Sequence, residues 1–375
     1  MPALNMPIYA NIKESPMKKL LSALLLLALF FTLAACDSVQ DAISDALAAP
    51  QAADTIGTGV PITIYSNSFD EERLTWLNEA AEFAGFNIQT HGQGGGDLTQ
   101  RLINESGNPQ ADVVFGLNAF LWHNLITNDV ITPYAPSWAQ EIPAGLNHPR
   151  GYYHALVIQA IMLTYDRNQV PEGPSDWHDL WQNPTFHGTY RFEPSLGGGT
   201  TQMVLAGILY RYRDDAGHLG VSEEGWANIA AFFRYGIPNT AGTSLFADMA
   251  NEDSPILMGQ MFHSIVTTNE RVHGVNAGFP VPAVGLPFVV EGIALVNGSQ
   301  QYEEAQRFID WFGSAEVQED WQMRFDSLPA NPNAREDVSS FGEMISNLPQ
   351  QQIDWAFVAE NMSAWVEHIY ANYMP

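Results

Sequence analysis

The stretch PITIYSNSFDEERLTWLNEAAEFAGFNIQT, residues 61–90, decides the fold class of this chain. Two short β-branched runs, 61–65 and 86–90, flank a segment whose apolar residues recur at helical spacing from Phe69 to Ala84. A strand, a helix and a second strand at this pitch predict a parallel sheet covered by helices. The folded part of the chain therefore begins as an α/β protein.

The alternation of strands and helices continues beyond this unit. A helix is expected at 97–103, a buried strand at 111–115 and a helix at 118–126, which makes the first lobe α/β throughout. Two long apolar runs, 152–165 and 279–296, predict extended crossings that leave this lobe and return to it. The other expected elements are strands at 189–193 and 256–262, and helices at 177–181, 202–213, 223–235, 244–250, 301–312, 315–325 and 350–370.

Two α/β lobes joined by two crossings place a central cleft where strands end and helices begin. We expect 60–158 together with 284–335 to form the first lobe, and 159–283 to form the second. Residues 336–375 are expected to form a C-terminal helical segment, and the sequence leaves its lobe open.

The N-terminus has the pattern of an export signal. Lysines and then a short apolar run follow Met17, so 1–35 predict a secretory signal peptide whose true start is Met17. The Leu-Ala-Ala-Cys sequence that ends at Cys36 resembles the lipobox of bacterial lipoproteins, which implies a lipid on this cysteine. An ordinary signal peptide with an incidental cysteine is the alternative. The polar, Ala-rich stretch 36–59 is expected to tether the folded part to the outer face of a cell membrane.

Composition and charge exclude several classes of protein. Hydrophobic residues make up 46% of the 375 residues, which is enough for two cores. Fifteen Lys and Arg face 42 Asp and Glu, and the resulting net charge of −27 argues against a nucleic-acid partner. A single cysteine rules out disulfides within the chain and Cys-rich metal sites.

Sequence motifs for catalysis are absent. The chain contains no Gly-x-Ser-x-Gly, no His-Glu-x-x-His and no cysteine nucleophile once Cys36 is assigned to the lipid. Its ten histidines are scattered without the spacing of metal ligands. We therefore expect no enzyme activity, no cofactor and no metal. A membrane-tethered hydrolase that uses scattered carboxylates is the alternative from another class.

Several stretches resemble family 1 extracellular solute-binding proteins, over residues 60–335. They are Ile-Thr-Ile-Tyr-Ser at 62–66, Gly-Gly-Gly-Asp-Leu at 94–98, Ala-Asp-Val-Val-Phe at 111–115, Glu-Glu-Ala-Gln-Arg-Phe-Ile-Asp-Trp at 303–311 and Ser-Leu-Pro-Ala-Asn-Pro at 327–332. The resemblance is to the branch of ferric-iron, phosphonate and related small-solute receptors of ABC transporters. It implies a two-lobed periplasmic-binding-protein-like fold (type II), and a monomer that delivers a small solute to an ABC permease.

Candidate ligand-binding residues of the first lobe follow its strands. Ser66, Asn67 and Ser68 offer two hydroxyls and an amide after the first strand, although Ser68 is also a plausible N-cap with Glu71 three residues on. Both roles stay open. Asn118, after the third strand, is an N-cap candidate that we also expect to face the cleft.

Glycines 94–96 follow the second strand. The absence of side chains permits close approach of a solute to backbone N–H groups, and we include Gly95 among the candidates. A flexible turn with Asp97 as the cap of the following helix is the competing interpretation.

The strongest candidate is Pro-Ser-Leu-Gly-Gly-Gly-Thr-Thr at 194–201, which leads from a strand into a helix. The N–H groups of Gly198 and Gly199 at a helix start, with the hydroxyls of Thr200 and Thr201, suit a phosphoryl or carboxylate group. A capped helix with a loose loop is the alternative. The stretch is not a Walker motif, because no lysine follows the glycines.

Glu291 lies near the hinge on the returning crossing. Its carboxylate suits an ammonium group or a metal, but we favour an arginine partner at the lobe interface. Ferric-binding relatives carry adjacent tyrosines where this chain has Met261 and Phe262. We therefore expect a small anionic solute, with a ferric-iron or amine receptor of the same family as the alternative.

Overall fold

The computed structural model describes residues 56–240, 242–336 and 338–374. The predicted signal peptide, the predicted lipidation site Cys36 and nearly all of the predicted tether lie outside the described residues. Within the described part, no helix is long and apolar enough to cross a membrane.

The first lobe is built on a sheet in the order β2–β1–β3–β11–β5. β1 (Pro61–Ser66) pairs in parallel with both β2 (Asn87–Gly92) and β3 (Val113–Gly116), as the alternating sequence predicts. The returning strand β11 (Phe288–Val296) pairs antiparallel with β3. The sheet is therefore mixed rather than wholly parallel.

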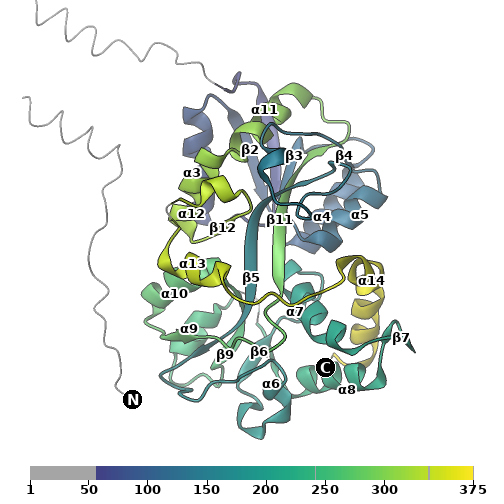
Figure 1. The fold of residues 1–375 in the computed structure, drawn as a ribbon, viewed down its shortest axis with the longest axis vertical. Helices are drawn as coiled ribbons and strands as arrows, with labels where there is room; N and C mark the ends of the chain where they lie inside the picture. Colours follow the sequence, from purple (N-terminus) through teal and green to yellow (C-terminus); the bar gives the residue numbers. More distant parts are fainter. Residues whose placement is uncertain (1–55, 241, 337, 375) are drawn as a thin grey trace, which may run out of the picture. The chain divides into compact units, whose positions relative to one another are not determined.

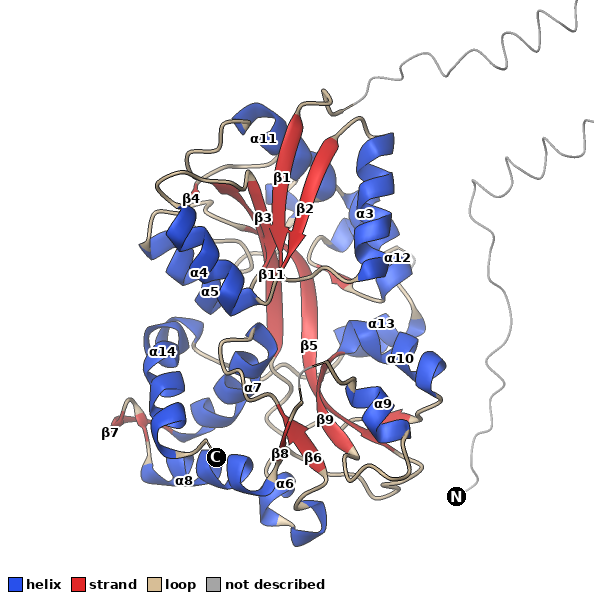
Figure 2. Cartoon of the chain, turned by 180° about the vertical axis from the view of Figure 1, so that it is seen from behind, coloured by secondary structure: helices blue, strands red, loops and turns tan. Residues whose placement is uncertain are grey.

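The outgoing crossing is the strand β5 (His154–Asp166), and it belongs to both lobes. Its first half pairs with β11, and its second half pairs with β9 (Met258–Phe262) of the second lobe. Thirteen extended residues span about 43 Å at 3.3 Å each, which is long enough to serve two sheets. β5 and β11 run from one lobe to the other in Figures 1 and 2, which confirms the two predicted crossings.

The second lobe continues from β5 through β9 to two short parallel strands. The order is β5–β9–β6–β8, with β6 at Tyr190–Phe192 and β8 at Ile237–Pro238. Among the other short strands, β4 (Ile131–Thr132) pairs with β11. Both β10 (Ala277–Gly278) and β12 (Leu328–Pro329) pair with β5. The strand β7 (Arg213–His218) is not part of this sheet.

Helices cover the sheets, and most lie where the apolar spacing predicts them. The first lobe contains α3 (Glu71–Phe83), α4 (Gly95–Glu105), α5 (Ala119–Thr127), α11 (Tyr302–Phe312) and α12 (Ala315–Phe325). The others are α6 (Asp179–Gln182), α7 (Gly199–Leu209), α8 (Glu223–Tyr235), α9 (Leu245–Ala250), α10 (Val266–His273), α13 (Ser340–Ser346) and α14 (Trp355–Asn372).

Three predicted bounds differ from the structure by four residues or more. The return strand begins at 288 rather than 279, because the prolines at 280, 282 and 287 have no N–H to donate to a ladder. α7 ends at Leu209 instead of reaching 213, and a 3₁₀ turn (Tyr210–Tyr212) follows it. The tail becomes helical at Trp355, where Asp354 caps it, and not at 350.

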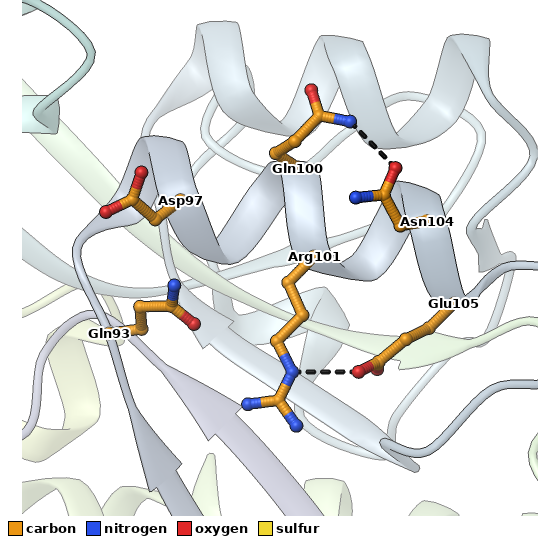
Figure 3. Close-up of a pocket in the computed structure, with 6 residues that line it drawn as sticks. All are labelled: Gln93, Asp97, Gln100, Arg101, Asn104 and Glu105. Atoms are coloured by element: carbon orange, nitrogen blue, oxygen red, sulfur yellow. Dashed lines mark hydrogen bonds and ion pairs between the residues drawn. The ribbon is translucent and has the colours of Figure 1, made fainter.

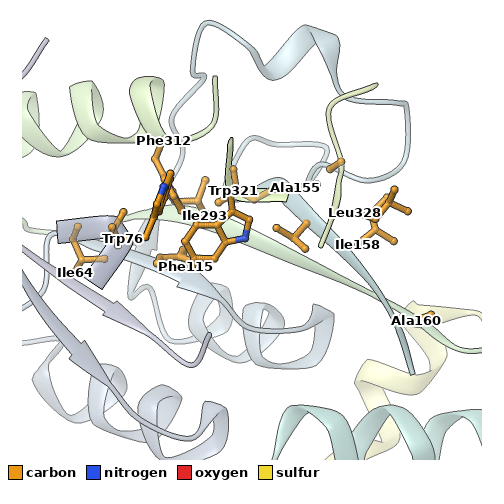
Figure 4. Packing of buried hydrophobic residues seen from close by; sticks show 14 of the residues in the cluster. Ile64, Trp76, Phe115, Ala155, Ile158, Ala160, Ile293, Phe312, Trp321 and Leu328 are labelled. Carbon is orange, nitrogen blue, oxygen red and sulfur yellow. The ribbon is translucent and has the colours of Figure 1, made fainter. Parts of the chain in front are cut away.

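An aromatic cluster forms the core of the first lobe beside the ends of its strands (Figure 4). Trp321 of α12 lies edge-on to Trp76 of α3 and to Phe312 of α11, with ring centroids 5.2 and 5.5 Å apart. Phe312 in turn contacts Phe115 at the end of β3, at 5.1 Å. Such buried aromatic pairs add packing specificity to the burial of apolar area. The cluster thereby holds α3 against the ends of β1 and β3.

The C-terminal helix α14 packs into the core of the second lobe, a lobe assignment that the sequence left open. Val358, Met362, Trp365 and Ile369 are all buried there, in the same apolar cluster as residues of α7 and α8. The start of α14 also reaches the first lobe, since the ring of Trp355 lies 5.7 Å from that of Phe120 in α5.

Candidate functional site

The turn between β1 and α3 carries Ser66, Asn67 and Ser68, and each of their side chains has a partner. Ser66 Oγ is buried and accepts a hydrogen bond from the Ser68 N–H at 2.9 Å. Asn67 Oδ1 accepts from the N–H of Leu117 at 2.7 Å, and Ser68 Oγ donates to Glu291 Oε2 at 3.0 Å. These bonds join the turn to the end of β3 and to β11.

Ser68 does not cap α3, so the capping role that the sequence left open for it is wrong. Asp70 is the N-cap, and its Oδ1 accepts the N–H of Arg73 at 2.8 Å. Aspartate and serine are both good caps, so the sequence alone does not decide between positions two residues apart. Because Ser68 does not cap the helix, its hydroxyl is available to Glu291.

The turn between β3 and α5 brings an amide side chain to the second lobe. Gly116 has a φ of +92°, and an added Cβ would lie 2.1 Å from Asn67 Oδ1, so only glycine fits there. Asn118 caps α5, as predicted, and its Oδ1 accepts two N–H groups of the first turn, both at 3.1 Å. Its Nδ2 donates across the lobe boundary to Gly199 O at 3.3 Å.

Helix α4 begins at Gly95, after Gly94 at the cap position, and no side chain caps it. The prediction that Asp97 is the cap is wrong, because this residue is exposed within the first helical turn. The first N–H groups of an α-helix have no acceptor within the helix. At α4 they also have no side-chain cap, so they are available to a ligand.

Helix α7 of the second lobe begins in the same way. It starts at Gly199 after Gly198, again without a side-chain cap. Thr200 is half-buried in its first turn. Thr201 is buried, and its Oγ1 accepts from Gln260 Nε2 of β9 at 3.1 Å, which leaves the hydroxyl proton free to donate elsewhere.

The starts of α4 and α7 meet at the lobe boundary. A Cβ added to Gly96, in the first turn of α4, would lie 2.6 Å from Gly197 O in the turn before α7. The two backbones therefore touch. Aligned peptide dipoles place about half a positive charge at each helix N-terminus. The contact brings two such ends, from different lobes, to one place.

Glu291 lies on β11, directly before the point at which the pairing with β5 shifts register. Its side chain is half-buried. Burial raises the pKa of its carboxyl, while the charge of Arg73 and the bond from Ser68 lower it in part. The arginine pairing that the sequence favoured is not formed, since no ion pair within 4.0 Å joins Glu291 to a described residue.

Arg73 is a residue at the lobe boundary that sequence reasoning missed. Its Nη2 donates to Ser264 Oγ of the second lobe at 3.2 Å, and its guanidinium lies over the ring of Phe325, 5.5 Å from the centroid. The same side chains line a pocket of about 240 Å³ with residues of α3 and α10. Arg73 is the only cation between 61 and 84, and that isolation was the available signal.

His263, beside Ser264, is fully buried where β5 meets β9. Its Nδ1 accepts the N–H of Ala160 at 3.0 Å, so the ring is neutral with its proton on Nε2. Burial lowers the pKa of His263 to about 4, and the charge of Arg73 acts in the same direction. No three His, Cys, Asp or Glu of the described ranges come together in a group that could hold a metal ion.

A larger depression of about 370 Å³ lies along the exposed face of α4 (Figure 3). Four of its six polar side chains pair with one another: Arg101 Nε meets Glu105 Oε1 at 2.8 Å, and Gln100 Nε2 donates to Asn104 Oδ1 at 3.0 Å. None of the predicted ligand-binding residues lines it. The lobe boundary is therefore the better candidate site.

Comparison with known sequences agrees with this architecture. Residues 108–361 match a family described as bacterial extracellular solute-binding protein. A probable ABC transporter periplasmic-binding protein of Sinorhizobium fredii, y4fP, is 34% identical over 334 residues, which cover 88% of this chain and 89% of that protein. A putative 2-aminoethylphosphonate-binding periplasmic protein of Salmonella typhimurium is 22% identical over 81% of this chain and 89% of its own length.

Comparison with solved structures confirms the two-lobed fold. The ferric binding protein from Campylobacter jejuni superposes with a TM-score of 0.68, over 83% of this chain and 99% of that one. The two sequences are only 18% identical, so this likeness concerns the fold alone.

Proposed function

This chain belongs to the family of bacterial extracellular solute-binding proteins, and we propose on that premise that it binds a small anionic solute between its lobes. It is the solute-binding component of an ABC transporter and not an enzyme. The proposed solute carries a phosphoryl or carboxylate group, which the starts of α4 and α7 bind through backbone N–H groups.

The observation that carries the proposal is the meeting of two uncapped helix starts. α4 and α7 both begin on glycine, and they touch where Gly96 meets Gly197. Uncapped N–H donors and the positive dipole ends of two helices at one place suit a phosphoryl or carboxylate group. Because one helix belongs to each lobe, an anion bound to both would favour the closed arrangement.

The acidic composition of the chain does not exclude an anion. Most Asp and Glu of the described residues are exposed, and salt screens such charges beyond about 8–10 Å. Donors in direct contact with the solute act at about 3 Å and outweigh that screened field. The Salmonella relative named for a phosphonate also favours a solute with an anionic head.

Calorimetry on a threonine double variant tests this proposal. Thr200→Val with Thr201→Val removes two hydroxyl donors and nearly preserves volume, so binding of the anionic solute should weaken by about 1–3 kcal/mol. The matched control is Thr75→Val with Thr127→Val, since both of these exposed threonines donate to the carbonyl four residues earlier in their own helices. Equal affinity for both double variants would contradict the proposal.

We further propose that residues 1–35 are removed as a signal peptide and that Cys36 carries a lipid. The motif before Cys36 supports this proposal, and a family described as extracellular is consistent with export. Cys36→Ser should move the protein from the membrane fraction to the soluble fraction with the same melting temperature. A variant that stays in the membrane fraction would show that the anchor is something else.

A further inference from the structure

Glu291 is a charged residue that the proposed anion site does not explain. It interrupts the apolar strand Phe-Val-Val-Glu-Gly-Ile-Ala-Leu-Val (Phe288–Val296), in which almost every neighbour is buried. One oxygen accepts from Ser68 Oγ at 3.0 Å, and no cation of the described residues pairs with the carboxylate. A half-buried carboxylate next to an anion site is unfavourable unless something supplies a positive charge.

The position of Glu291 places it in the same group of turns as the proposed anion donors. Its neighbour Gly292 pairs with Gly116, which lies at the end of β3 and contacts both Asn67 and Ser68. Asn67 Nδ2 would in turn lie 3.4 Å from a Cβ on Gly95 at the start of α4. A continuous series of contacts therefore leads from the carboxylate to the helix starts.

The backbone at Glu291 is irregular in a way that affects the side chain. The pairing of β11 with β5 shifts register between Glu291 and Gly292. Such bulges turn a side chain out of the ordinary alternation of a strand, and they are common beside binding sites. The irregularity is thus an independent reason to look for a ligand at this side chain.

Arg73 is the cation whose charge acts on Glu291, but its guanidinium is bound by other groups. Its Nη2 donates to Ser264, its Nε lies 3.6 Å from Asp70 Oδ2, and its guanidinium covers the ring of Phe325. These contacts keep the guanidinium beyond ion-pair distance of Glu291 while the lobes are together. No described residue therefore forms an ion pair with Glu291, although the charge of Arg73 acts on it from farther away.

We propose that the solute is a zwitterion whose protonated amine contacts Glu291 while its phosphoryl or carboxylate group lies at the starts of α4 and α7. The proposal rests on the proposed function, because it adds a cationic end to the same anionic solute. It names the class as short aminoalkyl phosphonates, aminoalkyl phosphates or amino acids. It also assigns selection against their deaminated analogues to Glu291.

Matched pairs of compounds test the amine directly. Calorimetry on the full-length protein would compare 2-aminoethylphosphonate with ethylphosphonate, and β-alanine with propionate. In at least one pair, the amine should strengthen binding by about tenfold or more, as a charge-assisted contact does. Glu291→Gln keeps an acceptor for Ser68 but removes the charge, and it should bring that ratio close to one.

The outcomes separate this inference from the function beneath it. Glu303→Gln is the matched control, because the Glu303 side chain is 87% exposed and its variant should keep the wild-type ratio. Deaminated analogues that bind as tightly as their amines in both pairs would overturn the zwitterion and leave the anionic function standing. So would a Glu291→Gln variant, folded as judged by its melting curve, that keeps the full ratio. Failure of all four compounds to bind would overturn the zwitterion class named here, and the anionic function would then be decided by the compound that co-purifies with the protein.

Discussion

Replacement of Gly96 by alanine should weaken solute binding by preventing full contact between the lobes. The new Cβ would lie 2.6 Å from Gly197 O and 3.1 Å from Gly197 C, both backbone atoms of the opposite lobe. Ordinary van der Waals contact of a Cβ begins at 3.4 Å, so the lobes must separate locally by about 0.8 Å. Overpacking of this kind costs about 1–3 kcal/mol, which corresponds to an apparent affinity about 5- to 150-fold lower.

The assay combines calorimetry with small-angle scattering of the solute-bound protein. Gly96→Ala should bind less tightly and have a larger radius of gyration than the wild type at saturation. Gly107→Ala is the matched control at the other end of α4, because a Cβ there meets no atom within 4 Å. Alanine also favours a helix over glycine, so the melting temperature of Gly96→Ala without solute should not fall below that of the wild type. Wild-type affinity and wild-type dimensions for Gly96→Ala would refute the reasoning.

Two further predictions concern acid. The pKa of His263 is about 4 in the folded chain and 6.5 ordinarily, so unfolding takes up a proton at any pH between these values. The free energy of unfolding should therefore fall by about 2–3 kcal/mol as the pH drops from 6.5 to 4. His263→Asn, whose Oδ1 can accept the Ala160 N–H, should flatten urea-unfolding midpoints in that window; an unchanged slope would exclude His263 as the cause. Burial alone would raise the pKa of Asp176, but bonds from His178 and Arg211 outweigh it and lower the pKa to about 2 from 3.8. The Asp176 carboxylate therefore stabilises the fold fully above pH 4, and about 2 kcal/mol of that stability is lost between pH 3.8 and 2. Asp176→Asn should remove this loss of stability below pH 3.8 and leave the loss due to His263. The same loss below pH 3.8 in the variant would contradict the assignment to Asp176.

The order of strands and helices could be predicted because their signals are local. β-branched runs and helical spacing lie within windows of ten to fifteen residues, and β1, α3, β5 and α14 all follow them. Helix starts were harder, since Ser68 and Asp70 are both good caps only two residues apart. α4 and α7 begin at Gly95 and Gly199, two and three residues before the predicted helices at 97 and 202, because glycine is more typical of helix ends.

The candidate site depends on contacts that no local pattern contains. Asn118 bonds to Gly199 81 residues away, and Ser68 bonds to Glu291 223 residues away. The sequence placed Ser68, Asn118 and Gly199 in strand-end turns, and Glu291 on the returning crossing near the hinge. The only signal for Arg73 in the sequence is that no other cation lies between 61 and 84, and its contact with Ser264 exists only once the second lobe is in place. The ligand-binding roles of all these residues stay predictions.

Identification of the bound solute tests the central claim most directly. The full-length protein would be purified without added ligand and denatured, and the released small molecules would be identified by mass spectrometry and metal analysis. The account predicts one compound, at about one per chain, that carries a phosphoryl or carboxylate group. Release of ferric iron, or of an organic cation without an anionic group, would contradict it.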